Sequence, residues 1–125
     1  MKLKSAVLAL ATLALASSAA HAQTQGVSKN EIVIGSIQDL SGPIAAFGKQ
    51  VRFGMQLRVD ELNEQSGGIH GRKLKVLIED SQYDPKKAVL AAQKLVNQDK
   101  IFAMVAHLGT TSNLAAMPVQ FAKNV

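Results

Sequence analysis

The fold is decided by the segment Glu31-Ile32-Val33-Ile34-Gly35-Ser36-Ile37, the first of three strand-like segments that alternate with helical patterns. It is rich in β-branched residues, and its apolar side chains do not alternate strictly, which is typical of a strand covered on both faces. Residues 73–79 predict a second strand, whose charged ends suit the edge of a sheet. Residues 101–106, the most apolar segment beyond residue 22, predict a third.

A helical pattern follows each predicted strand. Between residues 46 and 65, apolar side chains recur at spacings of three and four and form one stripe: Phe47, Val51, Met55, Val59 and Leu62. Asp84 before Pro85 predicts the start of a second helix, as an N-cap acceptor followed by proline at the first helical position. Its predicted inner stripe is Val89, Ala92, Leu95 and Val96. A third helix is expected to begin near Ser112, with a kink or a late start at Pro118.

Three strands alternating with three helices predict the fold class α/β, a parallel three-stranded sheet with flanking helices and right-handed crossovers. The third strand has the character of a central strand, but only one helix and no further strand follow it. An apolar strand with an open edge promotes aggregation. We therefore expect residues 23–125 to be the N-terminal part of a longer protein.

Residues 1–22 predict a removable signal peptide. Lys2 and Lys4 precede an uncharged stretch that is shorter than the roughly 20 apolar residues of a spanning helix. Small residues at Ala20 and Ala22 then favour cleavage before Gln23. Because the chain has no Cys, disulfides, thiolate zinc sites and a lipid-bearing N-terminal cysteine are excluded. The sequence therefore predicts a soluble, unlipidated periplasmic protein.

Charge and motifs argue against several function classes. The net charge is +5, and it falls to +3 without the two lysines of the leader, with no basic cluster, so nucleic-acid binding is not expected. Nucleophile-elbow, phosphate-loop and dinucleotide motifs are absent, so we expect no enzyme and no cofactor. His70 and His107 have no partners at metal-ligand spacing, so we expect structural histidines and no metal. Three carboxylates near strand ends are interpreted as turn and cap residues: Asp39, Asp80 and Asp84.

A ligand site is expected beyond the carboxyl ends of the strands, where ligands lie in open α/β sheets. If the first strand lies between the other two, the loops at residues 39–47 and 107–112 meet there. The second loop opens a helix and contains Gly109, Thr110, Thr111 and Ser112. Small residues, hydroxyl donors and free helix N–H groups favour an anion such as a carboxylate. The same residues could serve only to cap the helix, and the local sequence leaves both interpretations open.

An ordered set of motifs resembles the periplasmic leucine/isoleucine/valine-binding protein family. The motifs are residues 34–36, Asp39-Leu40-Ser41-Gly42-Pro43, Phe47-Gly48, residues 67–73, residues 79–85 and His107-Leu108-Gly109-Thr110-Thr111-Ser112. The resemblance spans nearly all of residues 23–125. It implies the N-terminal part of lobe 1 of a type I periplasmic binding protein, in which two lobes close on a solute.

The resemblance also implies particular ligand contacts. The position that matches Thr110 holds the carboxylate of the ligand with help from neighbouring backbone amides, so the candidate residues include Leu108, Gly109, Thr111 and Ser112. Phe47 matches an aromatic residue, commonly tyrosine, at the cleft. Phenylalanine keeps the apolar face but lacks the hydroxyl. Leucine-binding relatives carry a disulfide in this lobe, which this chain cannot form because it has no Cys.

The leading hypothesis is the extracytoplasmic solute-binding component of an ABC importer for branched-chain or related amino acids, or similar small carboxylates. Its partners would be the small-molecule ligand and the membrane permease of the importer, and we expect a monomer at full length. Two alternatives remain. A ligand-sensing domain of a receptor predicts a transmembrane segment downstream, and a truncated remnant predicts that no ligand raises the melting temperature.

We predict that residues 23–125, expressed alone, bind no amino acid tightly and tend to aggregate, because the third strand leaves an apolar edge open. Size-exclusion chromatography and amino-acid titration test this. A monomeric, cooperatively folding product with micromolar affinity would contradict it.

Overall fold

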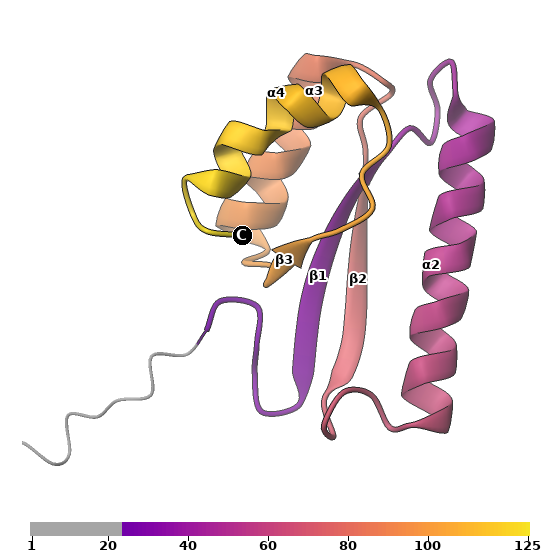
Figure 1. Ribbon diagram of the computed structural model, residues 1–125, viewed down its shortest axis with the longest axis vertical. Coiled ribbons are helices and arrows are strands. Elements are labelled where there is room, and N and C mark those ends of the chain that lie inside the picture. The colour runs from indigo at the N-terminus through magenta and orange to yellow at the C-terminus, as the bar shows by residue number, and fades with distance from the viewer. Residues whose placement is uncertain (1–23) are drawn as a thin grey trace, which may run out of the picture.

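Residues 24–125 are described by a computed structural model, and the predicted signal peptide lies outside them. The elements in chain order are β1 (Glu31–Gln38), α2 (Ala45–Gln65), β2 (Lys73–Asp80), α3 (Pro85–Gln93), β3 (Ala103–Met104) and α4 (Thr110–Phe121) (Figure 1). α3 continues into a π-helical segment, Lys94–Gln98. Within residues 24–125, no helix has the length and apolar character needed to cross a membrane.

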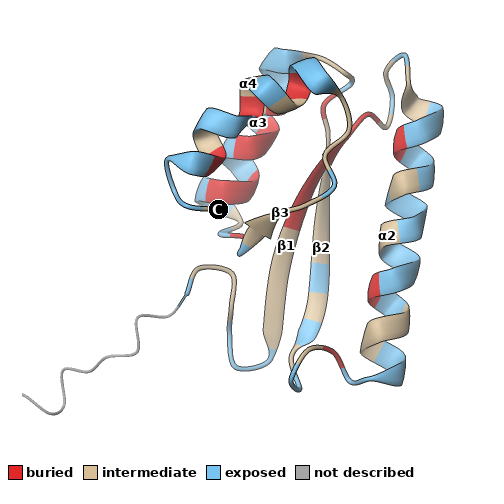
Figure 2. Ribbon diagram, viewed as in Figure 1, coloured by how far each residue is buried: buried red, intermediate tan, exposed pale blue. Residues whose placement is uncertain are grey.

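β1 is the central strand of a parallel sheet with the order β2-β1-β3. It pairs with β2 along its whole length, from Glu31 opposite Lys73 to Gln38 opposite Asp80. Its carboxyl-terminal half is buried, whereas its first half is half-buried (Figure 2). This confirms the predicted fold class, the edge position of the second strand and the placement of the first strand between the other two.

Helices cover both faces of the sheet, with α2 on one and the α3–α4 pair on the other (Figure 1). The core lies on the α3–α4 side and consists of Ile37, Ala88, Ala91, Ala92, Leu95, Val96, Ile101 and Ala116. Its four alanines leave room for α3 and α4 to approach each other and the sheet closely. Of the predicted α3 stripe, Val89 alone is only half-buried.

The α2 side is more open. Val59 is buried and the predicted stripe residues Val51, Met55 and Leu62 are half-buried, but Phe47 is 63% exposed, so its predicted place on the inner stripe is wrong. The reason lies in the next residue: a Cβ on Gly48 would lie 1.8 Å from the Asp39 carbonyl oxygen, just past the end of β1. The first turn of α2 therefore extends beyond the sheet, where Phe47 has no strand to pack against.

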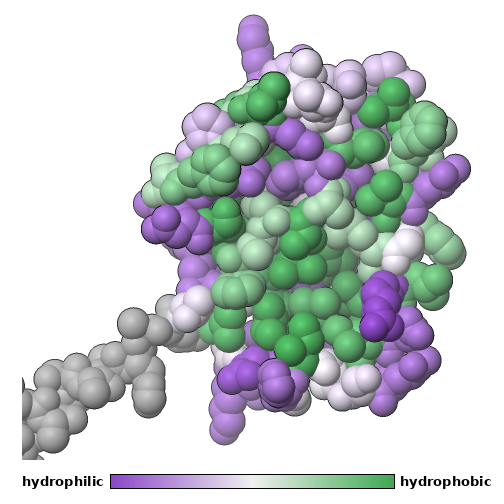
Figure 3. Space-filling view, viewed as in Figure 1, coloured by the Kyte–Doolittle hydropathy of each residue, from purple (hydrophilic) through white to green (hydrophobic). Residues whose placement is uncertain are grey.

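An apolar groove of about 390 Å³ also opens on this side, between α2 and the end of β3. It is lined by Ile34, Gly54, Met55, Arg58, Val59, Leu74, Val105 and Ala106. Figure 3 shows apolar side chains gathered over the strands in the same view as Figure 1.

β3 is shorter than predicted, with pairing at Ala103–Met104 instead of residues 101–106. Three N–H groups of this segment donate to β1 carbonyls. The Phe102 N–H donates to residue 33, the Val105 N–H to residue 35 and the Leu108 N–H to residue 37. From one of these hydrogen bonds to the next, this segment advances three residues while β1 advances two. Regular parallel pairing needs the same advance on both strands, so it cannot continue along this segment. Ala106, with φ 50°, turns the chain away after the strand.

The helix starts follow from local hydrogen bonds. Asp84 accepts from the N–H groups of Lys86 and Lys87 at 2.7 and 3.0 Å, which confirms its predicted N-cap role. α4 begins at Thr110, two residues before the expected start, because Gly109 (φ 105°) turns the chain directly into the helix. Pro118 lies inside α4, so the late start considered from sequence is wrong.

The open edge of β2 is closed by a side chain of α2. Asn63 Oδ1 accepts from the Leu74 N–H at 2.8 Å, and Asn63 Nδ2 donates to the Leu74 carbonyl at 2.7 Å. The amide therefore takes the place of a neighbouring strand at one residue, which blocks pairing with another chain there.

We predict that Asn63→Ala lowers the free energy of unfolding by about 1–2 kcal/mol, because two hydrogen bonds are lost. Denaturant unfolding measures this change, and amide exchange at Leu74 should accelerate. Gln56→Ala is the matched control on the same helix, since the Gln56 side chain donates to exposed Asp60, and it should change stability by about 0.5 kcal/mol or less. Equal effects of the two variants would contradict the role given to Asn63.

Candidate functional site

The candidate site lies at the carboxyl-terminal edge of the sheet, where α2, α3 and α4 all begin (Figure 1). Leu108 extends the contact of the third strand with β1, because its N–H donates to the Ile37 carbonyl at 3.0 Å. Gly109 then turns the chain so that Thr110, Thr111 and Ser112 form the first turn of α4. Five of the six predicted ligand residues are thus one continuous segment, residues 108–112, beside the end of β1.

The first turn of α4 presents unused hydrogen-bond donors. Within residues 24–125, the backbone N–H groups of Thr110, Thr111 and Ser112 have no acceptor. The Thr110 and Thr111 side chains are exposed, whereas Ser112 is 1% exposed and its Oγ has no partner in the described part of the chain. The positive end of a helix dipole with free N–H groups favours an anion. The arrangement can therefore bind a carboxylate without a cationic side chain.

Phe47, the sixth predicted residue, lies in the first turn of α2 at the same edge of the sheet. Its ring is mostly exposed and is free to make apolar contacts. The intervening loop is shaped by two carboxylates. Asp39 accepts from the N–H groups of Gly42 and Ile44, and Asp80 accepts from those of Leu40 and Gln82. The interpretation of these aspartates as turn residues is confirmed.

Asp80 remains charged in this role. Burial opposes ionisation, but hydrogen bonds from the Ser41 hydroxyl and from the Leu40 and Gln82 N–H groups hold the pKa of Asp80 below its ordinary value. A carboxylate that is ionised and already bonded to the loop holds the loop in place and is not available for proton transfer.

Buried polar side chains at the end of β1 hold the chain that enters the site. Ser36 and Gln38 are fully buried, and both donate to the Ala106 carbonyl. Gln38 also donates to Ser36 Oγ at 2.8 Å. Because a buried polar group without a partner is costly, these bonds fix where the chain leaves β3.

His107 links β1 to α4. The Ile37 N–H donates to His107 Nδ1 at 3.0 Å, so the neutral ring carries its proton on Nε2. Nε2 lies 3.1 Å from the end of the Gln120 side-chain amide and can only donate to it, so the amide must turn its oxygen toward the ring. Burial lowers the pKa of His107, and the hydrogen bond with Gln120 only partly opposes this shift. The prediction of a structural histidine is confirmed for His107. The described residues contain no group of three or more His, Cys, Asp or Glu that could hold a metal ion.

Sequence reasoning missed Tyr83, whose ring lies against Gly109. It also missed the supporting roles of Ser36, Gln38 and Gln120. One signal for these roles was available in the sequence. Two polar residues, Ser36 and Gln38, stand at the end of an otherwise apolar strand, directly before the loop predicted to border the ligand. Nothing in the local sequence indicated which loop the tyrosine would face.

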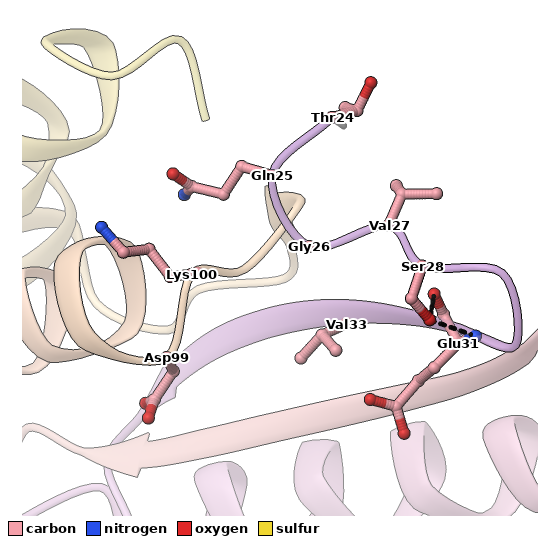
Figure 4. A pocket seen from close by; sticks show the side chains of 9 residues that line it. All are labelled: Thr24, Gln25, Gly26, Val27, Ser28, Glu31, Val33, Asp99 and Lys100. Carbon is pink, nitrogen blue, oxygen red and sulfur yellow. Dashed lines mark hydrogen bonds between the residues drawn. The ribbon is translucent and has the colours of Figure 1, made fainter. Parts of the chain in front are cut away.

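A second hollow, of about 400 Å³, lies at the opposite edge of the sheet (Figure 4). It is lined by the segment before β1 and by the turn that contains Asp99 and Lys100. Gln25 on this side uses its amide to donate to two backbone carbonyls. The buried side-chain atoms without partners, within residues 24–125, are Gln38 Oε1 and Ser112 Oγ, which belong to the carboxyl-terminal edge. We therefore place the candidate site there.

A family model described as periplasmic binding protein matches residues 31–125. The chain belongs to the periplasmic binding protein family. Leu/Ile/Val-binding protein homolog 3 from Brucella melitensis is 37% identical over 119 residues, which cover 95% of this chain and 28% of the relative. The resemblance and the type I fold predicted from the motifs are thereby confirmed.

Solved structures of periplasmic binding proteins agree. A fatty acid ABC transporter substrate-binding protein from Thermomonospora curvata is 32% identical with a TM-score of 0.76, covering 82% of this chain and 26% of that one. A second structure is the branched-chain amino acid transporter substrate binding protein LivJ from Streptococcus pneumoniae, in complex with isoleucine. It is 32% identical with a TM-score of 0.73, and the match covers 77% of this chain and 27% of LivJ. The chain spans about a quarter of the length of the curated relatives it matches.

We predict that stability falls as the pH drops from 7 to 5. The pKa of His107 is lowered from 6.5 in the folded state, so the unfolded chain takes up its proton first and is favoured as the pH falls below about 6.5. The dependence of the unfolding free energy on pH should be weaker in His107→Gln. His70→Gln, which removes an exposed imidazole, is the control and should keep the wild-type slope. An unchanged slope in His107→Gln would sink this assignment.

Proposed function

We propose that this chain is part of the first lobe of an extracytoplasmic solute-binding protein, and that the start of α4 holds the carboxylate of its ligand. The observation that carries the proposal is a set of donors at residues 110–112 that find no acceptor within residues 24–125: three backbone N–H groups and the buried Ser112 Oγ. A buried hydroxyl without a partner is costly, so a bound oxygen atom that accepts from it would remove that cost.

The chemistry of the relatives supports a carboxylate. One relative is named for leucine, isoleucine and valine, one structure contains isoleucine, and another protein is named for fatty acids. These solutes differ in their amino group and in their apolar part, but they share a carboxylate. A site that this chain has in common with such proteins is therefore expected to bind the shared group, while other residues select the remainder of the solute.

In this proposal the predicted residues would take three roles. The Thr110 and Ser112 hydroxyls and the backbone N–H groups of residues 110–112 would donate to the two carboxylate oxygens. Gly109 and Leu108 would supply the backbone that brings these donors to the sheet edge. Phe47 would contact the apolar part of the solute, since its exposed ring has no hydroxyl to donate.

We infer a binding protein rather than an enzyme, because the relatives that the chain matches are named for binding. In this proposal the second lobe completes the site by hinged closure, and the closed protein delivers its solute in the periplasm to the permease of an ABC importer. The apolar groove beside α2 and the open edge of β3 support a longer protein, because further elements of the same lobe would cover both.

We predict that the protein, expressed from its complete gene, binds L-isoleucine or a related carboxylate and discriminates against the matching amide. Isothermal titration would compare L-leucine, L-isoleucine, L-valine and hexanoate with L-isoleucinamide. Thr110→Ala should weaken binding of the acid about tenfold, since a hydrogen bond to a charged group contributes about 1.5 kcal/mol or more.

The matched control is Thr24→Ala, which removes an exposed threonine outside the site. It should leave every affinity unchanged. The proposal fails if the amide binds as tightly as the acid, or if Thr110→Ala and Thr24→Ala behave alike.

A further inference from the structure

The ring of Tyr83 lies against Gly109, the residue that turns the chain into α4. A Cβ built on Gly109 would lie 2.8 Å from Tyr83 Cε2 and 3.0 Å from Cδ2. The ring therefore occupies the space that a side chain would need. It joins the loop after β2 to residues 108–112, two segments that share no strand pairing.

The loop that carries Tyr83 is strained and firmly held. Gln82 and Tyr83 have φ values of 52° and 59°, so two successive residues other than glycine adopt the left-handed conformation. This conformation is unfavourable for residues with a Cβ, so it persists only where the surroundings impose it.

Hydrogen bonds from the sheet edge impose it here. The Gln82 N–H donates to Asp80 Oδ1 at 2.9 Å, and the Tyr83 N–H donates to Ser81 Oγ at 3.3 Å. Ser81 is fully buried and is itself bound to the Gln38 carbonyl through both its N–H, at 2.8 Å, and its hydroxyl, at 3.2 Å. The turn is thus anchored to the end of β1, and it directs the ring toward Gly109.

Gly109 needs such support because its own conformation is permissive. With φ 105° it lies in a region that other residues rarely adopt, and glycine resists rotation there less than any other residue. Hydrogen bonds hold the chain on either side of it: the Leu108 N–H donates to the Ile37 carbonyl, and the Asn113 N–H donates to the Gly109 carbonyl at 2.9 Å. A ring packed on the α-carbon restricts the remaining motion.

We propose that Tyr83 is a positioning residue of the ligand site: its ring packs on Gly109 and fixes the orientation of the donors at residues 110–112. This inference rests on the proposed function, since it assigns Tyr83 a role in carboxylate binding. The ring carries the role, and the hydroxyl does not, because the atoms that lie against Gly109 are ring carbons.

The experiment compares Tyr83→Ala with Tyr83→Phe in the protein expressed from its complete gene, with L-isoleucine and hexanoate as probes. Tyr83→Ala should weaken binding about tenfold, as the loss of one well-oriented contact does. Tyr83→Phe should bind within about twofold of wild type, because it keeps the ring. Phe53→Ala, which removes an exposed ring from the outer face of α2, is the control and should have no effect.

A second readout does not depend on ligand. In the NMR spectrum, the Gly109 α-protons should carry a ring-current shift that survives in Tyr83→Phe and disappears in Tyr83→Ala. Amide exchange of Asn113, whose N–H donates to the Gly109 carbonyl, should accelerate in Tyr83→Ala alone.

The possible results separate the two proposals. If wild type binds none of the carboxylates, the proposed function fails. If the ring-current shift of the Gly109 α-protons is absent as well, the positioning role of Tyr83 is also overturned. Unchanged affinity in Tyr83→Ala overturns the positioning role. A loss in Tyr83→Phe as large as in Tyr83→Ala also overturns it, because the hydroxyl would then be the functional group.

Discussion

The pairing of β1 with a parallel strand on each side is the constraint on which the rest of the structure depends. Parallel strands bring their carboxyl ends to one edge, so the loops that open α2, α3 and α4 must converge beyond β1. The last residues of β1 and Asp39 are then fully enclosed. A buried polar group needs a partner, and the Ser36 hydroxyl, the Gln38 amide nitrogen and the Asp39 carboxylate find theirs in the converging loops.

Burial of polar groups thus connects the fold to the site. Ser36 and Gln38 hold the chain after β3, while the Gln38 carbonyl holds the turn that carries Tyr83. Removing one partner inside such a network costs more than a surface hydrogen bond contributes. Among the described residues, the same enclosure leaves Ser112 Oγ without a partner at the point where the first N–H groups of α4 have no acceptor. The candidate site is therefore the place where this network of buried polar groups leaves hydrogen-bond donors without acceptors.

Much of the secondary structure was predictable because its causes are local. Asp84 and Pro85 set the start of α3, and the three- and four-residue spacing of apolar side chains set α2. β3 was predicted too long because its length depends on its hydrogen bonds to β1, which the local sequence does not show. Between successive bonds the third strand segment advances three residues while β1 advances two, so regular pairing ends early. Phe47 was misplaced for a similar reason, since the period of a helix does not show where the sheet beneath it ends.

The sequence by itself determined the alternation of strands and helices, the membership of the family and the segment 108–112 as the candidate ligand segment. Only the tertiary structure decided which side chains support that segment. His107 meets the Ile37 N–H across 70 residues of sequence, and Tyr83 meets Gly109 from a different loop. Such contacts depend on the order of the strands in the sheet and on the path of each loop. Local residue preferences carry no information about either.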